Sequence, residues 1–423
     1  MKLKRFSMQS SPYTIVRIAV MRTKLFTASH YHQFMHLSLI EMLQRLQESD
    51  YKDEISAYAL SAGSLTRLDD VLGKNMVRTM EKLRRISDEN TQRILEVYAM
   101  RSDFENLKTL LRGMRANIPA ERLKRHILPI GVLPETAWDD LMRHTLSVQD
   151  LCDQMRGSPF DHIKEAGEML ARKIDEMKNT QIDKMKDVQM EGKEKSEEEG
   201  AKKEEMAPGE AGKDEQKEIG RGKRRAEASL QEIPLASWEN LLEKQYYDFL
   251  SRFVKRYGGS SVGFDEFFTE EIDIRNITTL FKLMNEQVAP AQIRGYLFRN
   301  ERQDSIPQSI WDEALAKKAI PDLFKVFMKT KYRPAMDIAA KYHAQTGSLT
   351  RLETELEKQL LQYSTQLLHR HPLSVDVILG YLLSKSIEQK NLSMLIRGKM
   401  MGLPAESMEA FLITIPQQTR VMT

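Results

Sequence analysis

Internal repetition constrains the fold of this chain more than any other feature of its sequence. The hexapeptide Gly63–Leu68, GSLTRL in one-letter code, recurs without change as Gly347–Leu352. Chance does not readily produce an identity of six residues within one chain. A repeat of fixed length constrains the architecture of the whole chain more strongly than any single motif does.

A second pattern occurs in three copies. Each copy begins with an acidic residue, has an asparagine three residues later, and continues through apolar residues to a basic side chain. The three copies are Asp103, Asn106 and Arg112; Asp273, Asn276 and Lys282; and Glu388, Asn391 and Arg397. A Pro-Ala step then follows each copy, at Pro119, Pro290 and Pro404.

The spacing of the copies predicts three repeats, one of which is interrupted. An apolar-periodic stretch ends in an aromatic residue near the start of each copy, at Tyr51, Phe160 and Tyr332. The interval from Phe160 to Tyr332 is the longer one, and its excess coincides with a highly charged segment. We predict helical repeats at 13–140, 141–312 and 313–423, the middle one interrupted by an insert at about 178–227.

The charged segment is unlike the rest of the chain. Between Glu191 and Arg225, 21 of 35 side chains are charged. Such a stretch buries too little apolar surface to offset an ordering entropy of about 1–2 kcal/mol per residue. We therefore expect the insert at 178–227 to be disordered.

The repeats themselves predict helices. Apolar residues after the first acid fall at Leu107, Leu110 and Leu111, which lie on one face of a helix. A proline followed by an acid or amide suits the first turn of the next helix. Alternating strand patterns and hairpin dipeptides are scarce. We predict an all-α protein.

The repeated acids and asparagines have two interpretations. Because they lie on or beside the apolar stripe, they should be partly buried and need hydrogen-bond partners. The first interpretation, which we favour, is a polar clamp between helices that recurs in each repeat. In the second, these residues and the three basic side chains present a polar surface to a partner.

Composition narrows the class of protein. The 64 basic and 61 acidic residues nearly balance, and no basic stripe indicates nucleic-acid binding. A single cysteine, Cys152, excludes an intramolecular disulfide and favours a reducing compartment. No apolar run reaches the roughly 18 residues of a membrane span. We expect neither an integral membrane protein nor a secreted one.

Motifs for catalysis are scarce, so we predict no catalytic, cofactor or metal site. The Gly-Lys dipeptides lack the other residues of a phosphate-binding loop. His32 and His36 have the i, i+4 spacing of zinc ligands on a helix, but no glutamate lies between them. We interpret them as surface or interface histidines.

Several segments resemble a known family. Tyr13–Leu25, Leu43–Ile55 and Asp103–Gly113 resemble the C subunit of archaeal and bacterial A/V-type ATP synthases, which is related to the vacuolar ATPase d subunit. The resemblance extends from about Tyr13 to Phe411, except for the charged insert.

The resemblance implies a funnel of three similar helical domains around a pseudo-three-fold axis. It also implies a role that is not catalytic. One copy per complex would sit on the membrane rotor ring at the cytoplasmic face and receive the tip of the central stalk. It would transmit torque between ATP chemistry and proton or sodium transport. The alternatives are a soluble helical-repeat scaffold unrelated to ATPases and, less favoured, a metal-dependent hydrolase that uses His32 and His36.

The insert gives a first prediction. Replacing residues 178–227 by a short flexible linker should leave the helicity and the melting temperature almost unchanged, because a disordered segment contributes little to the core. Circular dichroism during heating measures both quantities. Loss of cooperative unfolding in the deletion variant would show that the insert is structural.

Overall fold

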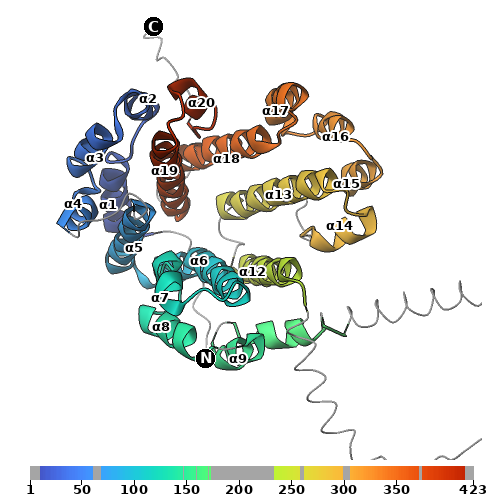
Figure 1. The fold of residues 1–423 in the computed structure, drawn as a ribbon, viewed down its shortest axis with the longest axis horizontal. Coiled ribbons are helices and arrows are strands. Elements are labelled where there is room, and N and C mark those ends of the chain that lie inside the picture. Colours follow the sequence, from blue (N-terminus) through green and yellow to red (C-terminus); the bar gives the residue numbers. More distant parts are fainter. Residues whose placement is uncertain are drawn as a thin grey trace, which may run out of the picture. The chain divides into compact units, whose positions relative to one another are not determined.

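A computed structural model shows the chain as a set of helices (Figure 1). The residues that it describes are 10–60, 68–145, 147–158, 160–169, 171–172, 233–257, 262–298, 305–370 and 374–414. No strand occurs among them, which confirms the all-α prediction. The predicted insert at 178–227 and the first copy of the hexapeptide, up to Arg67, lie outside the described residues.

The chain divides into two compact units. The first consists of Met1–Asp103, Leu128–Leu133 and Tyr246–Thr423, and the second of Phe104–Ile127 and Pro134–Gln245. Two long helices, α6 (Glu89–Arg115) and α12 (Leu235–Tyr257), have residues in both units.

The other helices belong to one unit each. The first unit contains α1 (Pro12–Arg22), α2 (Ala28–His36), α3 (Leu39–Gln47), α4 (Lys52–Leu60), α5 (Leu68–Ile86), α13 (Val262–Asn285), α14 (Pro290–Tyr296), α15 (Gln308–Leu315), α16 (Ile320–Phe327), α17 (Arg333–Thr346), α18 (Thr350–Arg370), α19 (Asp376–Met400) and α20 (Ala405–Glu409). The second contains α7 (Ala120–Leu123), the short 3-10 helix η2 (Lys124–His126), α8 (Glu135–His144) and α9 (Val148–Gln154). None of the described helices has both the length and the apolar character needed to cross a membrane.

Packing in the first unit brings distant parts of the chain together. Helix α18 contacts α13, α17 and α19, and the N-terminal helices α1, α2, α3 and α5 all contact α19 (Figure 1). One buried cluster joins the two ends, and it includes Tyr31, Tyr51 and Leu72 from the N-terminal helices and Leu392 and Leu395 from α19. Burial of large apolar side chains contributes about 1.5–3 kcal/mol each, so this cluster holds the two ends firmly.

The second unit has its own buried aromatic side chains. Trp138 on α8 and Trp238 on α12 are both fully buried. Trp238 packs directly against the backbone at Gly167, where an added methyl group would lie 2.4 Å from the indole. Phe104 on α6 meets Phe160 edge to face, with ring centroids 5.1 Å apart.

Three long helices, α6, α13 and α19, end in the same way. Eleven positions after its asparagine, each reaches a residue in the left-handed region: Asn117 (φ 52°), Gln287 (φ 58°) and Gly402 (φ 69°). The next amide then donates to the carbonyl five residues earlier, in the pairs Ile118–Gly113 (2.8 Å), Val288–Leu283 (2.9 Å) and Leu403–Gly398 (2.9 Å). This is a Schellman motif, which satisfies carbonyls at the end of a helix. Residues at a fixed distance from the asparagine are therefore structurally equivalent in the three copies.

The Pro-Ala steps begin helices, with one shift of register. Pro119 and Pro404 are the cap residues that precede α7 and α20, and the equivalent cap before α14 is Ala289. Pro290 follows it as the first helical residue. Proline is tolerated at both positions because neither amide has a partner within the helix.

Candidate functional site

The repeated asparagines bind main-chain groups. The Asn276 Nδ2 donates to the carbonyl of Phe298 (2.6 Å), and the Phe298 amide donates to Asn276 Oδ1 (2.8 Å). Asn391 makes the same two bonds with Ile413, each at 2.9 Å. Asn106 is buried as well. These amides pair with a peptide group that would otherwise be buried without a hydrogen bond.

The repeated acids bind segments that lead into helices. Asp103 Oδ2 accepts hydrogen bonds from the amides of Val132 (2.6 Å) and Leu133 (3.4 Å), just before α8. Glu388 Oε2 accepts one from the amide of Phe26 (2.7 Å), just before α2. The third acid, Asp273, also binds a segment that leads into a helix.

Asp273 accepts a hydrogen bond from the hydroxyl of Ser305, two residues before the cap of α15. The three acids thus attach to equivalent places in the chain. We call each acid, its asparagine and the groups they bind a polar clamp.

The tyrosines Tyr51 and Tyr332 complete two of the clamps. The Tyr51 hydroxyl donates to Glu388 Oε1 (2.9 Å). The Tyr332 hydroxyl lies within hydrogen-bonding distance of both Asp273 Oδ2 (3.1 Å) and Glu270 Oε2 (2.8 Å). Phe160, at the corresponding place in the sequence, has no hydroxyl, and its ring packs against Phe104.

Each of these aromatics follows a hydroxyl residue that stabilises a turn. The side chains of Ser49, Ser158 and Thr330 donate to the carbonyl three residues earlier, at distances of 2.7, 2.6 and 2.6 Å respectively. Each also accepts from the amide of the aromatic two residues later, at 3.2, 3.1 and 3.2 Å. Our sequence analysis missed these hydroxyls, although a Ser or Thr two positions before each aromatic was a visible signal.

Lysines balance the buried carboxylates. Lys385 Nζ lies 2.7 Å from Glu388 Oε1 and 4.2 Å from the centroid of the Tyr51 ring. The side chains of Lys385 and Glu388 are only 3% and 2% exposed. In the second clamp Lys331, which precedes Tyr332, bonds Glu270 at 2.6 Å. A buried charge is tolerated only when it is paired and hydrogen-bonded in this way.

The same environment keeps the tyrosine hydroxyls protonated. Burial, followed by the nearby Glu388 carboxylate, raises the pKa of Tyr51 well above its ordinary value. Burial and the carboxylates of Asp273 and Glu270 raise the pKa of Tyr332 in the same direction. Both hydroxyls therefore act as hydrogen-bond donors at neutral pH.

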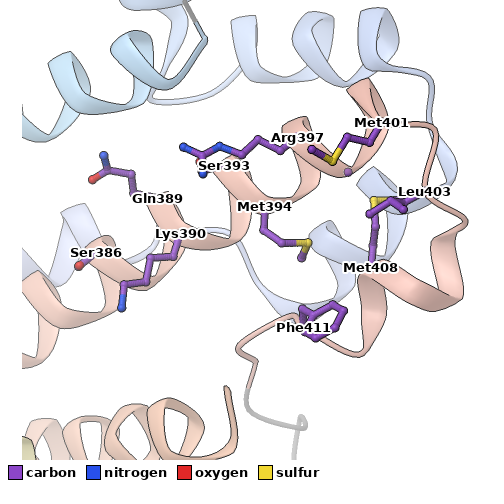
Figure 2. Close-up of a pocket in the computed structure, with 11 residues that line it drawn as sticks. Ser386, Gln389, Lys390, Ser393, Met394, Arg397, Met401, Leu403, Met408 and Phe411 are labelled. Carbon is purple, nitrogen blue, oxygen red and sulfur yellow. The ribbon is translucent and has the colours of Figure 1, made fainter. Parts of the chain in front are cut away.

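Two of the repeated cations pair with acids from other helices. Arg112 forms a two-pronged contact with Glu239 on α12, at 2.6 and 2.8 Å. Lys282 lies 2.5 Å from Glu353 on α18. Both cations are solvent-exposed, so these pairs contribute little stability by themselves, about 1 kcal/mol at most. Arg397 lines a groove between α19 and α20 (Figure 2).

The histidines of α2 and the single cysteine, which could in principle bind a metal or act as a nucleophile, have structural roles. His30 caps α2 by accepting from the Thr27 amide at 3.1 Å, and the rings of His32 and His36 lie 4.9 Å apart on the same helix. Burial raises the pKa of the Cys152 thiol to about 12, which keeps it protonated and unreactive at neutral pH. Among the described residues, no three His, Cys, Asp or Glu side chains gather in a metal-binding arrangement.

Comparison with known proteins points to one family. The sequence profile of the ATP synthase (C/AC39) subunit family matches residues 14–190 and 222–411. The unmatched residues between these segments lie within the predicted insert.

Individual relatives agree with this match. The C subunit of the A-type ATP synthase of Methanococcoides burtonii is 24% identical over 397 residues, which cover 93% of this chain and 91% of that protein. The same subunit of Methanosarcina barkeri is 23% identical over 419 residues, or 97% of this chain and 95% of that protein. That of Methanocaldococcus jannaschii is 21% identical over 408 residues, or 96% and 87%. The similarity thus extends along most of each chain.

The asparagines distinguish the two interpretations of the clamps. Replacing Asn106, Asn276 or Asn391 singly by leucine should lower the free energy of unfolding by about 1–3 kcal/mol, because a buried peptide group loses its partners. Urea unfolding measures the change. The same replacement at the exposed Asn285 should change it by less than about 0.5 kcal/mol and serves as the control. An intact fold combined with loss of partner binding would favour the partner-surface interpretation instead.

The raised pKa of Tyr51 predicts how the free energy of unfolding depends on pH. In the unfolded chain Tyr51 ionises near pH 10, but in the fold its pKa is higher, so the folded state holds the proton more tightly. The stability that Tyr51 contributes is therefore complete below pH 10 and is lost as the pH rises further. Tyr51→Phe should reduce the loss of stability above pH 10 by up to about 1.4 kcal/mol per pH unit.

Urea unfolding at pH 9, 10 and 11 tests this prediction. At pH 7 the Tyr51→Phe variant should be less stable by about 1–3 kcal/mol, because Glu388 loses a hydrogen bond. Tyr13 is 61% exposed, so Tyr13→Phe is the matched control and should leave the alkaline slope unchanged. An equal slope in wild type and Tyr51→Phe would contradict the prediction.

Proposed function

The chain belongs to the ATP synthase (C/AC39) subunit family, and from this premise we propose that it is the adapter of a rotary A/V-type ATP synthase. It couples the rotor stalk of the soluble, ATP-handling head to the ion-translocating ring in the membrane. The adapter itself is not catalytic. The observation that carries the proposal is the similarity to the C subunits of A-type ATP synthases along most of the chain.

The partners and the location follow from this role. We propose that one copy per complex contacts the stalk subunits and the membrane rotor ring at the cytoplasmic face, as a peripheral subunit. The repeats at 13–140, 141–312 and 313–423 would form the funnel with pseudo-three-fold symmetry that the family resemblance implies. The shared helix ends and polar clamps of α6, α13 and α19 support three equivalent repeats.

The contacts within the fold suit an adapter that transmits force. Such a protein must resist twisting, and packed helices joined by buried hydrogen bonds deform little. The clamps hold the segments before α2, α8 and α15 by main-chain and side-chain bonds. In this proposal Asp103, Asp273 and Glu388 stiffen the adapter, and exposed side chains contact its partners.

Affinity purification from membranes tests the proposal. The full-length tagged chain, expressed in its own host, is purified from detergent-solubilised membranes, and the co-purifying chains are identified by mass spectrometry. Recovery of stalk and ring subunits together with ATPase activity is the expected result. Recovery of soluble partners alone, with the chain absent from the membrane fraction, would overturn the adapter and favour the scaffold.

A further inference from the structure

The outer face of helix α1 carries a row of exposed apolar side chains. Tyr13, Val16 and Val20 are 61%, 62% and 52% exposed. Their spacing of three and then four residues places them on one face of the helix. The other large apolar side chains that are exposed in the described part of the chain lie singly or around a turn, so this row is the one that follows a helix. We call it the α1 stripe.

The opposite face of α1 holds the helix in place. Thr14, Ile18 and Met21 are buried, and α1 contacts α5 and α19. The Thr14 hydroxyl also donates to the carbonyl of Ile86, at 2.6 Å. The fold therefore fixes the α1 stripe in position without burying it.

Helix α1 also lies outside the repeated pattern. The acids of the three clamps bind the segments before α2, α8 and α15, which are therefore equivalent helices. Helices α8 and α15 come after α7 and α14, the short helices that follow the Schellman motifs, whereas α2 comes after α1. Among the described helices α1 thus has no counterpart in the other two copies, and the repetition does not account for its outer face.

Cations surround the α1 stripe. Helix α1 contains two arginines and no acid, and one of the two, Arg17, is exposed. Burial lowers the pKa of Lys82 on α5, the charges of Lys24, Arg17 and Arg78 lower it further, and Asp50 raises it. The four cations therefore lie close enough together to act on one another.

Two of these cations are already neutralised within the fold. Lys24 pairs with Asp50 at 3.3 Å, and Arg78 pairs with two acids of α4 at 2.9 and 2.7 Å. Within the described residues, Arg17 and Lys82 form no ion pair with a carboxylate. Positive charge that the fold leaves unbalanced beside the α1 stripe favours a partner with acidic side chains.

The spacing of the α1 stripe fits a helix as the occupant. Tyr13, Val16 and Val20 have the a, d, a spacing of a coiled-coil seam, and Arg17 takes position e, where charged residues select the partner. A seam this narrow suits one helix that lies along α1. A helix that binds a membrane surface instead presents apolar residues such as Trp, Phe and Leu to the lipid.

Charge also distinguishes among the protein segments that could cover the α1 stripe. Residues 1–9 of this chain contain three basic residues and no acid. A second copy of α1 would place one cationic face against another. Like charges brought together at an interface oppose binding, so both of these occupants are disfavoured and an acidic helix is favoured.

We infer that the α1 stripe binds an acidic amphipathic helix of another subunit of the ATP synthase. That helix would place apolar residues, three or four positions apart, against the α1 stripe and its acidic residues beside Arg17 and Lys82. The inference rests on the proposed function, which supplies the other subunits as partners.

Rebinding of the full chain tests the inference. Binding is measured separately to the soluble head with its stalk and to the detergent-solubilised membrane sector, each purified from a strain that lacks this chain. Val16→Glu should weaken binding to one of them at least about tenfold, because it places an acid against an acidic helix. Arg17→Glu should weaken the same binding, and its effect should shrink as the salt concentration rises. Both variants should keep the melting temperature, since both side chains are exposed.

The matched control is Ile338→Glu on α17. Ile338 is a single apolar side chain that is 45% exposed, so the change should leave both dissociation constants within about twofold of wild type. If wild type binds and both α1 variants bind equally well, the α1 stripe is not the site, and the proposed function still stands. If wild type binds neither preparation, the proposed function fails and the inference fails with it.

Cross-linking identifies the occupant directly. A photoreactive benzoylphenylalanine replaces Val16 in the full chain within the assembled complex, and the cross-linked product is identified by mass spectrometry. A peptide of another subunit with apolar residues at helical spacing and acidic residues beside them would support the inference. Cross-links to lipid, to a second copy, or to residues 1–9 or 178–227 of the same chain would overturn it.

Discussion

The buried carboxylate of Glu388 connects the two ends of the described chain. One of its oxygens accepts from the Phe26 amide, and the other accepts from the Tyr51 hydroxyl and from Lys385. These bonds attach the N-terminal helices to α19, where the apolar cluster alone would allow sliding. Hydrogen bonds have fixed directions and apolar contacts do not, so the carboxylate sets the register of the packing. Once the carboxylate is buried, each donor becomes necessary, because loss of one leaves a charge that water cannot reach.

The clamps of α13 and α19 both balance a buried carboxylate with a lysine, but the lysine comes from a different place in the chain in each. In the clamp of α19 the cation, Lys385, comes from the helix that carries the acid. In the clamp of α13 it is Lys331, which belongs to the turn before Tyr332. The second copy has Phe160 where the first and third copies have Tyr51 and Tyr332, so it has one hydroxyl fewer. A repeated backbone leaves each copy free to balance its charges separately, which is how related repeats diverge without changing fold.

The same freedom extends to positions outside the clamps. In the proposed role, an adapter between two different partners would not present three identical faces, although its repeats share one fold. The methionines around Met394 and Met401 distinguish the third copy at positions where the first and second copies carry polar residues or alanine.

The sequence by itself determined that the repeats are helical, that helices begin at the Pro-Ala steps and that the repeated acids and asparagines are buried. These follow from local rules, because helical periodicity, capping and the cost of burying polar groups depend on neighbouring residues. It also indicated that Asn276 and Asn391 need partners, but not that these are Phe298 and Ile413. The one-residue shift of Pro290 was also invisible, since a proline is compatible with both positions at the start of a helix.

Only the tertiary structure decided which groups meet. Phe26 contributes a backbone amide, which carries no signal in the side-chain pattern, and it lies at the opposite end of the chain from Glu388. The pairing of Arg112 with Glu239 depends on the rotation and register of two packed helices. The groove lined by Met394 and Met408 exists because α20 folds back along α19 after the turn at Gly402. Such contacts arise from the packing of whole helices, and a repeat in the sequence does not specify how its copies pack.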